Sequence, residues 1–407
     1  HLPLFLAAHQ GLALPGDSPE DLRDRLDKLF GYPAPAGAWE EHLFPARLSP
    51  YFSAWLDGLL QTTGLAWFGC GKEKIGFSFS DDLELFLPPA GEEGSQGPPE
   101  EAAKDELASL LPRTQGRYSF FEIGRFAGMD SRTLTAKLWR LVWQGRLTND
   151  GFAIVRKGIM TGFAPLPLDR GRGRPSRSAY NRWAASRPLS GNWHALAGEG
   201  LEHDSLDEME LARDRVRQLL RRYGVLFREL TAGELPLLQW GKLFKALRLM
   251  ELSGEILSGQ FFEGIPGAQF ISHEAFRILN HPLPEEAVFW LNACDPASLC
   301  GLKLELLKGR LPSRVPSTHL VYRGKALVLI SRRGGAALEF LAPPGDPRLP
   351  EYLAFFKILL SREFEPEKRI LVETINRRPA QESDYARALR EFGFRGGYKG
   401  LELARSY

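Results

Sequence analysis

The chain has 407 residues, of which 52 are lysine or arginine and 50 are aspartate or glutamate, so its formal net charge is only +2. This near balance excludes recognition of a polyanion by net charge alone, and any such partner has to be met by local basic patches. The length allows about two to four domains. Three scattered cysteines exclude a disulfide framework, and no apolar run is long enough to span a membrane. We therefore expect a cytoplasmic protein without a membrane partner.

The first block, residues 1–87, starts at His1 with the apolar segment HLPLFLAA, without a charged leader. This start predicts a piece of a longer protein. Helical patterns follow at residues 20–30 and 51–62, and Gly64 then precedes the aromatic hairpin LAWFGCGKEKIGFSF. We interpret the block as a partial leading segment and a winged helix. A proline- and glycine-rich stretch, residues 88–101, ends it.

The second block, residues 100–160, contains the most informative pattern of the chain. Four apolar residues share one face of a predicted helix, namely Leu134, Leu138, Leu141 and Val142. Gly145 ends this helix, and strand-like segments at residues 146–148 and 152–155 then enclose a turn. A helix, a glycine and a hairpin in this order predict a winged helix, in which the hairpin is the wing.

The same helix has a polar face, formed by Thr133, Lys137, Arg140 and Gln144. Such a face contacts the phosphates and base edges of DNA, or it is simply a solvated helix surface. We expect Trp139 and Trp143 to pack against a neighbouring block rather than to stack on bases. Asn149 and Asp150 are expected to stabilise the turn of the wing through hydrogen bonds from side chain to backbone.

Residues 161–200 are expected to form a basic linker. Between residues 156 and 187 the basic side chains face a single acid, Asp169; they are Arg156, Lys157, Arg170, Arg172, Arg174, Arg177, Arg182 and Arg187. Residues 172–175 spell RGRP, the core of an AT-hook, whose arginines enter a narrow minor groove. The alternative is a solvated linker. The local charge favours contact with single-stranded or duplex DNA.

The third block, residues 203–273, repeats the second. When Gly254 is aligned on Gly145, apolar positions coincide: Leu243 with Leu134, Leu247 with Leu138, Met250 with Leu141, Leu252 with Trp143, Ile256 with Leu147 and Phe261 with Phe152. This internal repeat predicts tandem winged helices.

The fourth block, residues 285–407, changes to short apolar runs with turn signals between them, such as VFWLNACD and KALVLISRR, which predict strands. Two helices are expected at residues 349–360 and 382–391, before a last strand near residues 401–404. The predicted fold class is therefore α+β, with tandem winged-helix domains followed by a small β-barrel or mixed-sheet domain with appended helices.

The sequence contains few candidates for catalysis. Asp295 precedes a proline, so we expect its side chain to cap a turn. A base-excising enzyme would instead use Asp295 or Glu263 to activate water or to stabilise an oxocarbenium ion. Gln269 either reads a base edge or caps the hairpin of the third wing. Cys294 and Cys300 lack the spacing of a zinc pair, and we predict no metal site.

Eight segments resemble, in the same order, the C-terminal region of bacterial large helicase-related (Lhr-type) proteins. They are FLAAHQGL (residues 5–12), FPARLSPYFSAWLDGLL (44–60), LWRLVWQGRLTND (138–150), RRYGVLFREL (221–230), LFKALRLMELSG (243–254), GQFFEGIPGAQF (259–270), NACDPAS (292–298) and GFRGGYKGLELAR (393–405).

The resemblance implies a run of winged helices that ends in a β-barrel, an array similar to winged-helix DNA glycosylases that excise alkylated purines. It also implies an ATP-dependent helicase core as the N-terminal partner within the same protein. Gly71 and Lys72 lack the spacing of a phosphate loop, so this chain is expected to need no cofactor, and ATP and magnesium are expected only for the core. The Gln-x-Asp or Gln-x-Gln motif of alkylpurine glycosylases is absent, and no aspartate follows Asp384.

We therefore expect a nucleic-acid-binding region of a nucleoid-associated DNA repair helicase, with homo-oligomerisation left open. The alternative is a DNA glycosylase that acts on uracil or alkylated bases.

Overall fold

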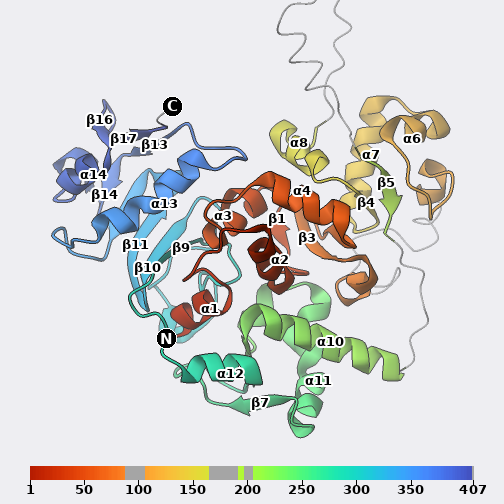
Figure 1. Ribbon diagram of the computed structural model, residues 1–407, viewed down its shortest axis with the longest axis horizontal. Helices are drawn as coiled ribbons and strands as arrows, with labels where there is room; N and C mark the ends of the chain where they lie inside the picture. Colours follow the sequence, from red (N-terminus) through yellow and green to blue (C-terminus); the bar gives the residue numbers. More distant parts are fainter. Residues whose placement is uncertain (88–105, 165–190, 197–204, 406–407) are drawn as a thin grey trace, which may run out of the picture.

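The computed structural model describes residues 1–87, 106–164, 191–196 and 205–405. We call the successive parts the first unit (1–87), the second unit (106–164 with 191–196), the third unit (205–280) and the C-terminal unit (288–405). The first unit lies at the centre, and the other three surround it (Figure 1). None of the described helices is long and apolar enough to cross a membrane.

The first unit contains the helices and the aromatic hairpin that its sequence predicts. Helix α2 begins at Pro19 because Ser18 caps it, with the Ser18 hydroxyl accepting the Asp21 amide at 3.1 Å. Its strands are antiparallel in the order β1-β3-β2. The elements are α1 Leu2–His9, α2 Pro19–Lys28, β1 Ala34–Pro35, a π-helix Trp39–Leu43, α3 Phe44–Arg47, α4 Ser53–Thr62, β2 Leu65–Gly69, β3 Lys74–Phe79 and a 3₁₀ helix Ser80–Leu85.

The second unit is built around two capped helices. Ser119 and Glu122 form a capping box at the start of α6, and Asp130 caps α7. The four apolar residues of the predicted α7 face are fully buried. The Asn149 carboxamide accepts the Gly151 amide at 2.9 Å, which confirms its expected role in the turn. The elements are α6 Phe120–Ala127, α7 Ser131–Trp143, β4 Leu147–Asn149, α8 Ala153–Thr161 and β5 Trp193–Ala195.

The wing of the second unit differs from the prediction. The second strand expected at residues 152–155 is wrong, because α8 starts there. Phe152, Val155 and Ile159 have helical spacing, and Gly162 ends the helix with a φ of 60°. The strand that pairs with β4 is β5, which lies within the segment expected to be a linker.

The third unit repeats the motif of the second. Helices α7 and α11 both have 13 residues, and each is followed by a strand after a glycine with positive φ, 71° at Gly145 and 75° at Gly254. Its sheet is antiparallel in the order β6-β8-β7. The elements are α10 Ser205–Tyr223, β6 Val225–Leu226, 3₁₀ helices Leu230–Gly233 and Pro236–Leu238, α11 Trp240–Leu252, β7 Ile256–Gly259, β8 Gln269–Ser272 and α12 His273–Asn280.

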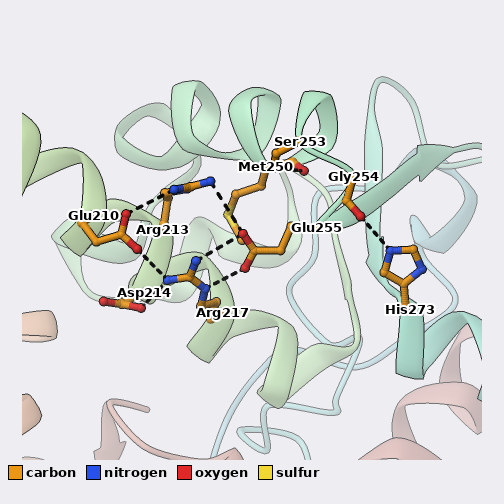
Figure 2. Close-up of polar contacts among 9 residues, drawn as sticks. All are labelled: Glu210, Arg213, Asp214, Arg217, Met250, Ser253, Gly254, Glu255 and His273. Carbon is orange, nitrogen blue, oxygen red and sulfur yellow. Dashed lines mark hydrogen bonds and ion pairs between the residues drawn. The ribbon is translucent and has the colours of Figure 1, made fainter.

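Two arginines of α10 hold the turn between α11 and β7. Arg217 donates to Glu255 at 2.7 Å and also binds Glu210 and Asp214 (Figure 2). Arg213 bridges Glu210 and Glu255. These cations already have carboxylate partners, so this side of α10 offers little positive charge to an external anion.

The C-terminal unit is an open mixed sheet, so that of the two expected forms the mixed sheet is confirmed and the described residues form no closed β-barrel. Six strands run in the order β15-β14-β12-β11-β10-β9, with β12 and β14 parallel, while β13-β17-β16 form a second sheet. No pairing joins the edge strands β15 and β9 within residues 285–405, all of which are described. Strand β15 has only two residues, and one is Pro379, which lacks an amide hydrogen. Strand β9 packs instead against the π-helix of the first unit.

The helices and the last strand of this unit agree with the prediction to within a few residues. The elements are β9 Val288–Asn292, a 3₁₀ helix Glu305–Leu307, β10 His319–Arg323, β11 Ala326–Arg332, a 3₁₀ helix Arg333–Gly335, β12 Ala337–Phe340, α13 Leu349–Ser361, β13 Arg369–Val372, β14 Thr374–Ile375, β15 Arg378–Pro379, a 3₁₀ helix Ala380–Glu382, α14 Ala386–Phe392, β16 Arg395–Gly396 and β17 Leu401–Ala404.

Candidate nucleic-acid interface

The polar face of α7 is only partly available to a ligand. The Thr133 hydroxyl donates to Asp130 at 2.6 Å as part of the helix cap. Arg140 is exposed but forms an ion pair with Glu106. Lys137 is half-buried and forms no ion pair with a described residue, and the half-buried Gln144 ends the helix. Of the two cations among the four predicted contact residues, Lys137 is thus the one without a carboxylate partner among the described residues.

The C-terminal end of α7 docks on the first unit. The Gly71 amide donates to the Trp143 carbonyl at 3.0 Å, and the Thr148 hydroxyl donates to the Trp67 carbonyl at 2.6 Å. A Cβ atom on Gly69 would lie 1.8 Å from the Val142 carbonyl oxygen, so the two backbones approach as closely as a glycine permits. The N-terminal part of α7, including the exposed Arg132, lies outside this contact and is open to a partner.

The two tryptophans of α7 are packed rather than presented to bases. Their rings stack with centroids 5.2 Å apart, and the Phe163 ring packs edge-on to both at 4.8 and 4.9 Å. Trp193 of β5 packs edge-on to Trp139 at 5.9 Å. Both rings are packed as expected, but the prediction that they pack against a neighbouring block is wrong, because their ring partners belong to the same unit.

Arg156 connects the second unit to the first, which corrects its expected contact with phosphate. Its guanidinium donates to Glu40 at 2.6 and 2.9 Å and to Asp57 at 2.9 and 2.8 Å. Glu40 is only 1% exposed and also accepts the Tyr51 hydroxyl at 2.6 Å. Because all three guanidinium nitrogens are occupied, Arg156 has a structural role here. Burial lowers the pKa of the neighbouring Lys157, which is half-buried.

The remaining arginines proposed for DNA contact lie outside the described residues. They are Arg170, Arg172, Arg174, Arg177 and Arg182. Their predicted role, including the AT-hook, stays a prediction.

Helix α11 carries exposed cations that the sequence reasoning missed. Lys242 and Lys245 are exposed and form no ion pair with any described residue, whereas Arg248 pairs with Glu251. The opposite face of α11 is buried against α10. The signal was present in the repeat, because its alignment places Lys242 on Thr133, at the start of the predicted polar face.

Gln269 is fully buried and closes the hairpin of the third unit. Its carboxamide oxygen accepts the amides of Phe261 and Phe262 at 3.1 and 2.9 Å, and its nitrogen donates to the Phe262 carbonyl at 2.9 Å. The capping role is therefore confirmed, and a base-reading role is corrected, because both ends of the amide are occupied. Glu263 is exposed in the same hairpin loop and forms no ion pair with a described residue.

Asp295 is a buried structural carboxylate and not a free catalytic group. Arg47 donates to its two oxygens at 2.6 and 2.8 Å, and both side chains are at most 1% exposed. Asp295 also accepts the Ala297 amide at 2.8 Å, which confirms the expected cap. Gln10 shares the same guanidinium at 2.7 Å. The structure does not bring Asp295 into contact with Glu263 or Gln269.

A cavity of about 530 Å³ lies where the first, third and C-terminal units meet. Burial raises the pKa of Tyr32 in its wall to about 12, so that the phenol is a neutral donor. Among the described residues, no three His, Cys, Asp or Glu side chains are grouped to hold a metal ion. The cavity is lined by Tyr32, Tyr223, Arg228, Glu229, Leu230, Ala232, Gly233, Pro296, Ser298, Cys300, Gly301, Leu302, Lys303 and Arg314.

Comparison with known proteins identifies related sequences. Residues 1–82 and 205–289 each match a family model described as "Large helicase-related protein, winged-helix domain". The "Lhr helicase/uracil glycosylase" of Escherichia coli (strain K12) is 28% identical over 409 residues, which cover 93% of this chain and 26% of that protein. The "Lhr helicase/ probable uracil glycosylase" of Mycolicibacterium smegmatis (strain ATCC 700084 / mc(2)155) is 30% identical over 347 residues, which cover 79% of this chain and 22% of that protein. The chain thus spans about a quarter of the length of these relatives.

A solved structure has a similar fold. The DNA glycosylase AlkZ of Streptomyces sahachiroi superposes with a TM-score of 0.53 at 14% identity, covering 93% of this chain and 97% of that one. The family models and the two relatives confirm the resemblance predicted from the motifs: the chain is related to the large helicase-related (Lhr-type) proteins and carries two of their winged-helix domains.

Proposed function

We propose that this chain is a DNA-binding region of an Lhr-type protein, and that it binds DNA through the outer faces of α11 and the N-terminal part of α7. The observation that carries the proposal is the solvent-facing pair Lys242 and Lys245, which has no ion pair within the described residues. The second helix of a winged helix enters the major groove, where such cations neutralise phosphates and release counterions. The exposed Arg132 and the half-buried Lys137 occupy the corresponding part of α7.

Binding of this chain to a labelled duplex, followed by fluorescence anisotropy over a range of salt concentrations, tests the proposal. Replacing both lysines (K242A/K245A) should weaken binding about tenfold, or 1.4 kcal/mol. It should also reduce the slope of log affinity against log salt by about 2, since two phosphate contacts are lost.

The matched control is K325A/K368A, which removes two exposed lysines of the C-terminal unit. Equal losses for the two double variants would show that α11 is not the contact surface, and undetectable binding by the unchanged chain would reject the function itself.

We also propose that this region works beside an ATP-dependent helicase core in the parent protein. The support is that both relatives are named as helicases and are about four times as long as this chain. ATP and magnesium would then serve the core alone. DNA-stimulated ATP hydrolysis by this chain in a phosphate-release assay would contradict this division of labour. Homo-oligomerisation and association with the nucleoid remain proposals, to be tested by light scattering and by imaging of the parent protein.

The alternative function is excision of uracil or alkylated bases. The descriptions of the two relatives and the fold shared with AlkZ favour it. The chain would be incubated with uracil-containing and alkylated duplexes, and abasic sites would then be cleaved with alkali. Strand breaks above a buffer control would support excision, whereas DNA that is bound but left intact would restrict the function to binding for those lesions.

A further inference from the structure

We propose that the cavity between the first, third and C-terminal units receives one nucleotide that has left the base stack of bound DNA. This inference rests on the proposed DNA binding and specifies where the protein would hold a base. The cavity volume of about 530 Å³ falls within the range of roughly 300–1,000 Å³ that is usual for small-ligand sites.

The interior of the cavity is aromatic and apolar. Tyr32 and Tyr223 are 6% and 3% exposed, and Leu230 and Cys300 are buried beside them. The Tyr32 hydroxyl donates to the Cys294 carbonyl at 2.5 Å. Because the phenols are held in place by such bonds, the interior is preorganised for a flat, weakly polar group such as a base.

Hydrogen bonds to the rest of the fold keep the two phenols from competing for the ligand. The Tyr223 hydroxyl donates to Glu234 at 2.5 Å, and Arg314 donates to the Tyr32 oxygen at 2.8 Å. Arg314 also donates to the carbonyls of Cys294 and Asp295 at 3.2 and 3.0 Å. These bonds tie the first unit to the C-terminal unit around the cavity.

The rim of the cavity is cationic and exposed. Arg228 and Lys303 are exposed and belong to different units, the third unit and the C-terminal unit. Neither forms an ion pair with a described residue. Glu229 is the one carboxylate in the lining, so that with Arg314 the lining has an excess of positive charge. A nucleotide combines a flat base with an anionic phosphate, and it matches an aromatic interior below a basic rim.

The approach of a backbone to the rim is sterically open. Gly233 and Gly301 are both exposed at the rim, and a Cβ atom on Gly233 would meet nothing within 4 Å. A base that leaves the stack must be held by contacts that offset the free-energy cost of unstacking, which is lowest for a mismatched base. Contacts from the lining residues of the third unit and of the C-terminal unit would hold such a base.

The test uses the whole chain and a duplex with a single uracil–guanine mismatch beside 2-aminopurine, whose fluorescence rises when its neighbour unstacks. The unchanged chain should raise the fluorescence at saturation. Gly233→Trp fills the mouth of the cavity and should abolish most of this rise. The affinity measured by anisotropy should stay within about twofold of that of the unchanged chain, a difference of roughly 0.4 kcal/mol. Gly64→Trp is the matched control, because Gly64 is also exposed and has nothing within 4 Å of a Cβ.

A second variant guards against misfolding of the first. R228A/K303A keeps the cavity open but removes the rim cations, and it should lower the fluorescence rise at saturation at least threefold. If the chain binds the duplex but neither variant changes the fluorescence relative to Gly64→Trp, the cavity inference is wrong and DNA binding stands. A wild-type complex without any fluorescence rise also overturns it. If the unchanged chain does not bind the duplex at all, the proposed function fails, and the cavity inference with it.

Discussion

The second and third units share one motif but use it in different ways. In both, a 13-residue helix is followed by a glycine and a strand. At the aligned positions near the helix end, Trp143 is half-buried in an aromatic cluster, whereas Leu252 is 78% exposed. The repeat therefore preserves the apolar side chains that face the core of each unit. The side chains on the outer surface determine whether the helix packs against another unit or stays exposed to a partner.

The wings of the second and third units also differ, in the strand that each first wing strand pairs with. Strands β7 and β8 form a hairpin within the third unit. Strand β4 pairs instead with β5, and helix α8 intervenes between them in the chain. Helix α8 carries Arg156, which binds the first unit through Glu40 and Asp57. The enlarged wing thus adds an anchor to the docking of α7 on the first unit, whereas the cations of α11 in the third unit stay exposed.

The largest effect should come from removing this anchor. Arg156→Ala leaves the buried Glu40 without its cation, and we expect the free energy of unfolding to fall by about 3–5 kcal/mol. Urea denaturation of the chain measures it. Arg140→Ala, which breaks the exposed pair with Glu106, should lower it by only about 0–1 kcal/mol. Similar losses for both would mean that the second unit is not anchored through Arg156.

A smaller loss is expected when the aromatic cluster is opened. Trp143→Ala removes ring contacts with Trp139 and Phe163. Full burial of a tryptophan would make the loss about 3–5 kcal/mol, and because Trp143 is only half-buried we expect about 2 kcal/mol. The same denaturation experiment reads it out. If Trp143→Ala lowered the free energy of unfolding by less than a typical surface substitution, the contrast between the docked helix α7 and the exposed helix α11 would be wrong.

The two helices should also differ in DNA binding. R132A/K137A in α7 should weaken binding about threefold, or roughly 0.7 kcal/mol, because this helix is docked at one end and Lys137 is half-buried. The corresponding loss for K242A/K245A is about tenfold. Anisotropy titrations of both variants at one salt concentration make the comparison, and a reversed order would show that α7 is the principal reader.

The smallest effect is expected at the aligned partner of Trp143. Leu252→Ser replaces a side chain that is 78% exposed, so the free energy of unfolding should change by no more than about 0.5 kcal/mol. If this variant were as unstable as Trp143→Ala, then Leu252 would be buried in solution against a partner, such as a second copy of the chain. Light scattering would detect that partner as an oligomer.

Local periodicity predicted most of the elements, because a helix or a strand leaves its repeat in neighbouring residues. The helices α2, α4, α7 and α13 and the strand β17 were predicted within a few residues. Residues 152–155, which begin the helical spacing of α8, were interpreted as a strand, since the turn before them suggested a hairpin. The partner of β4 could not be found, because it lies more than forty positions along the chain.

The roles of the candidate site residues depended on contacts that no local pattern contains. Arg156 and Asp295 were identified by charge and by a neighbouring proline, yet their partners Glu40 and Arg47 lie in the first unit. Whether a sheet is open or closes into a barrel likewise depends on the pairing of its edge strands, which the alternation of apolar and polar residues does not specify. The caps at Asn149 and Gln269 depend on short-range hydrogen bonds, and turn chemistry suggested both.

The bond between Arg47 and Asp295 also has a consequence for how the chain is made. Synthesis proceeds from the N-terminus, so the first unit emerges from the ribosome long before residue 295 is added. Until then Arg47 lacks the Asp295 carboxylate that accepts hydrogen bonds from both of its terminal guanidinium nitrogens in the finished fold. The first unit should therefore remain incompletely closed during translation and mature only when the C-terminal unit arrives, so that of the four units it is synthesised first and is among the last to become rigid.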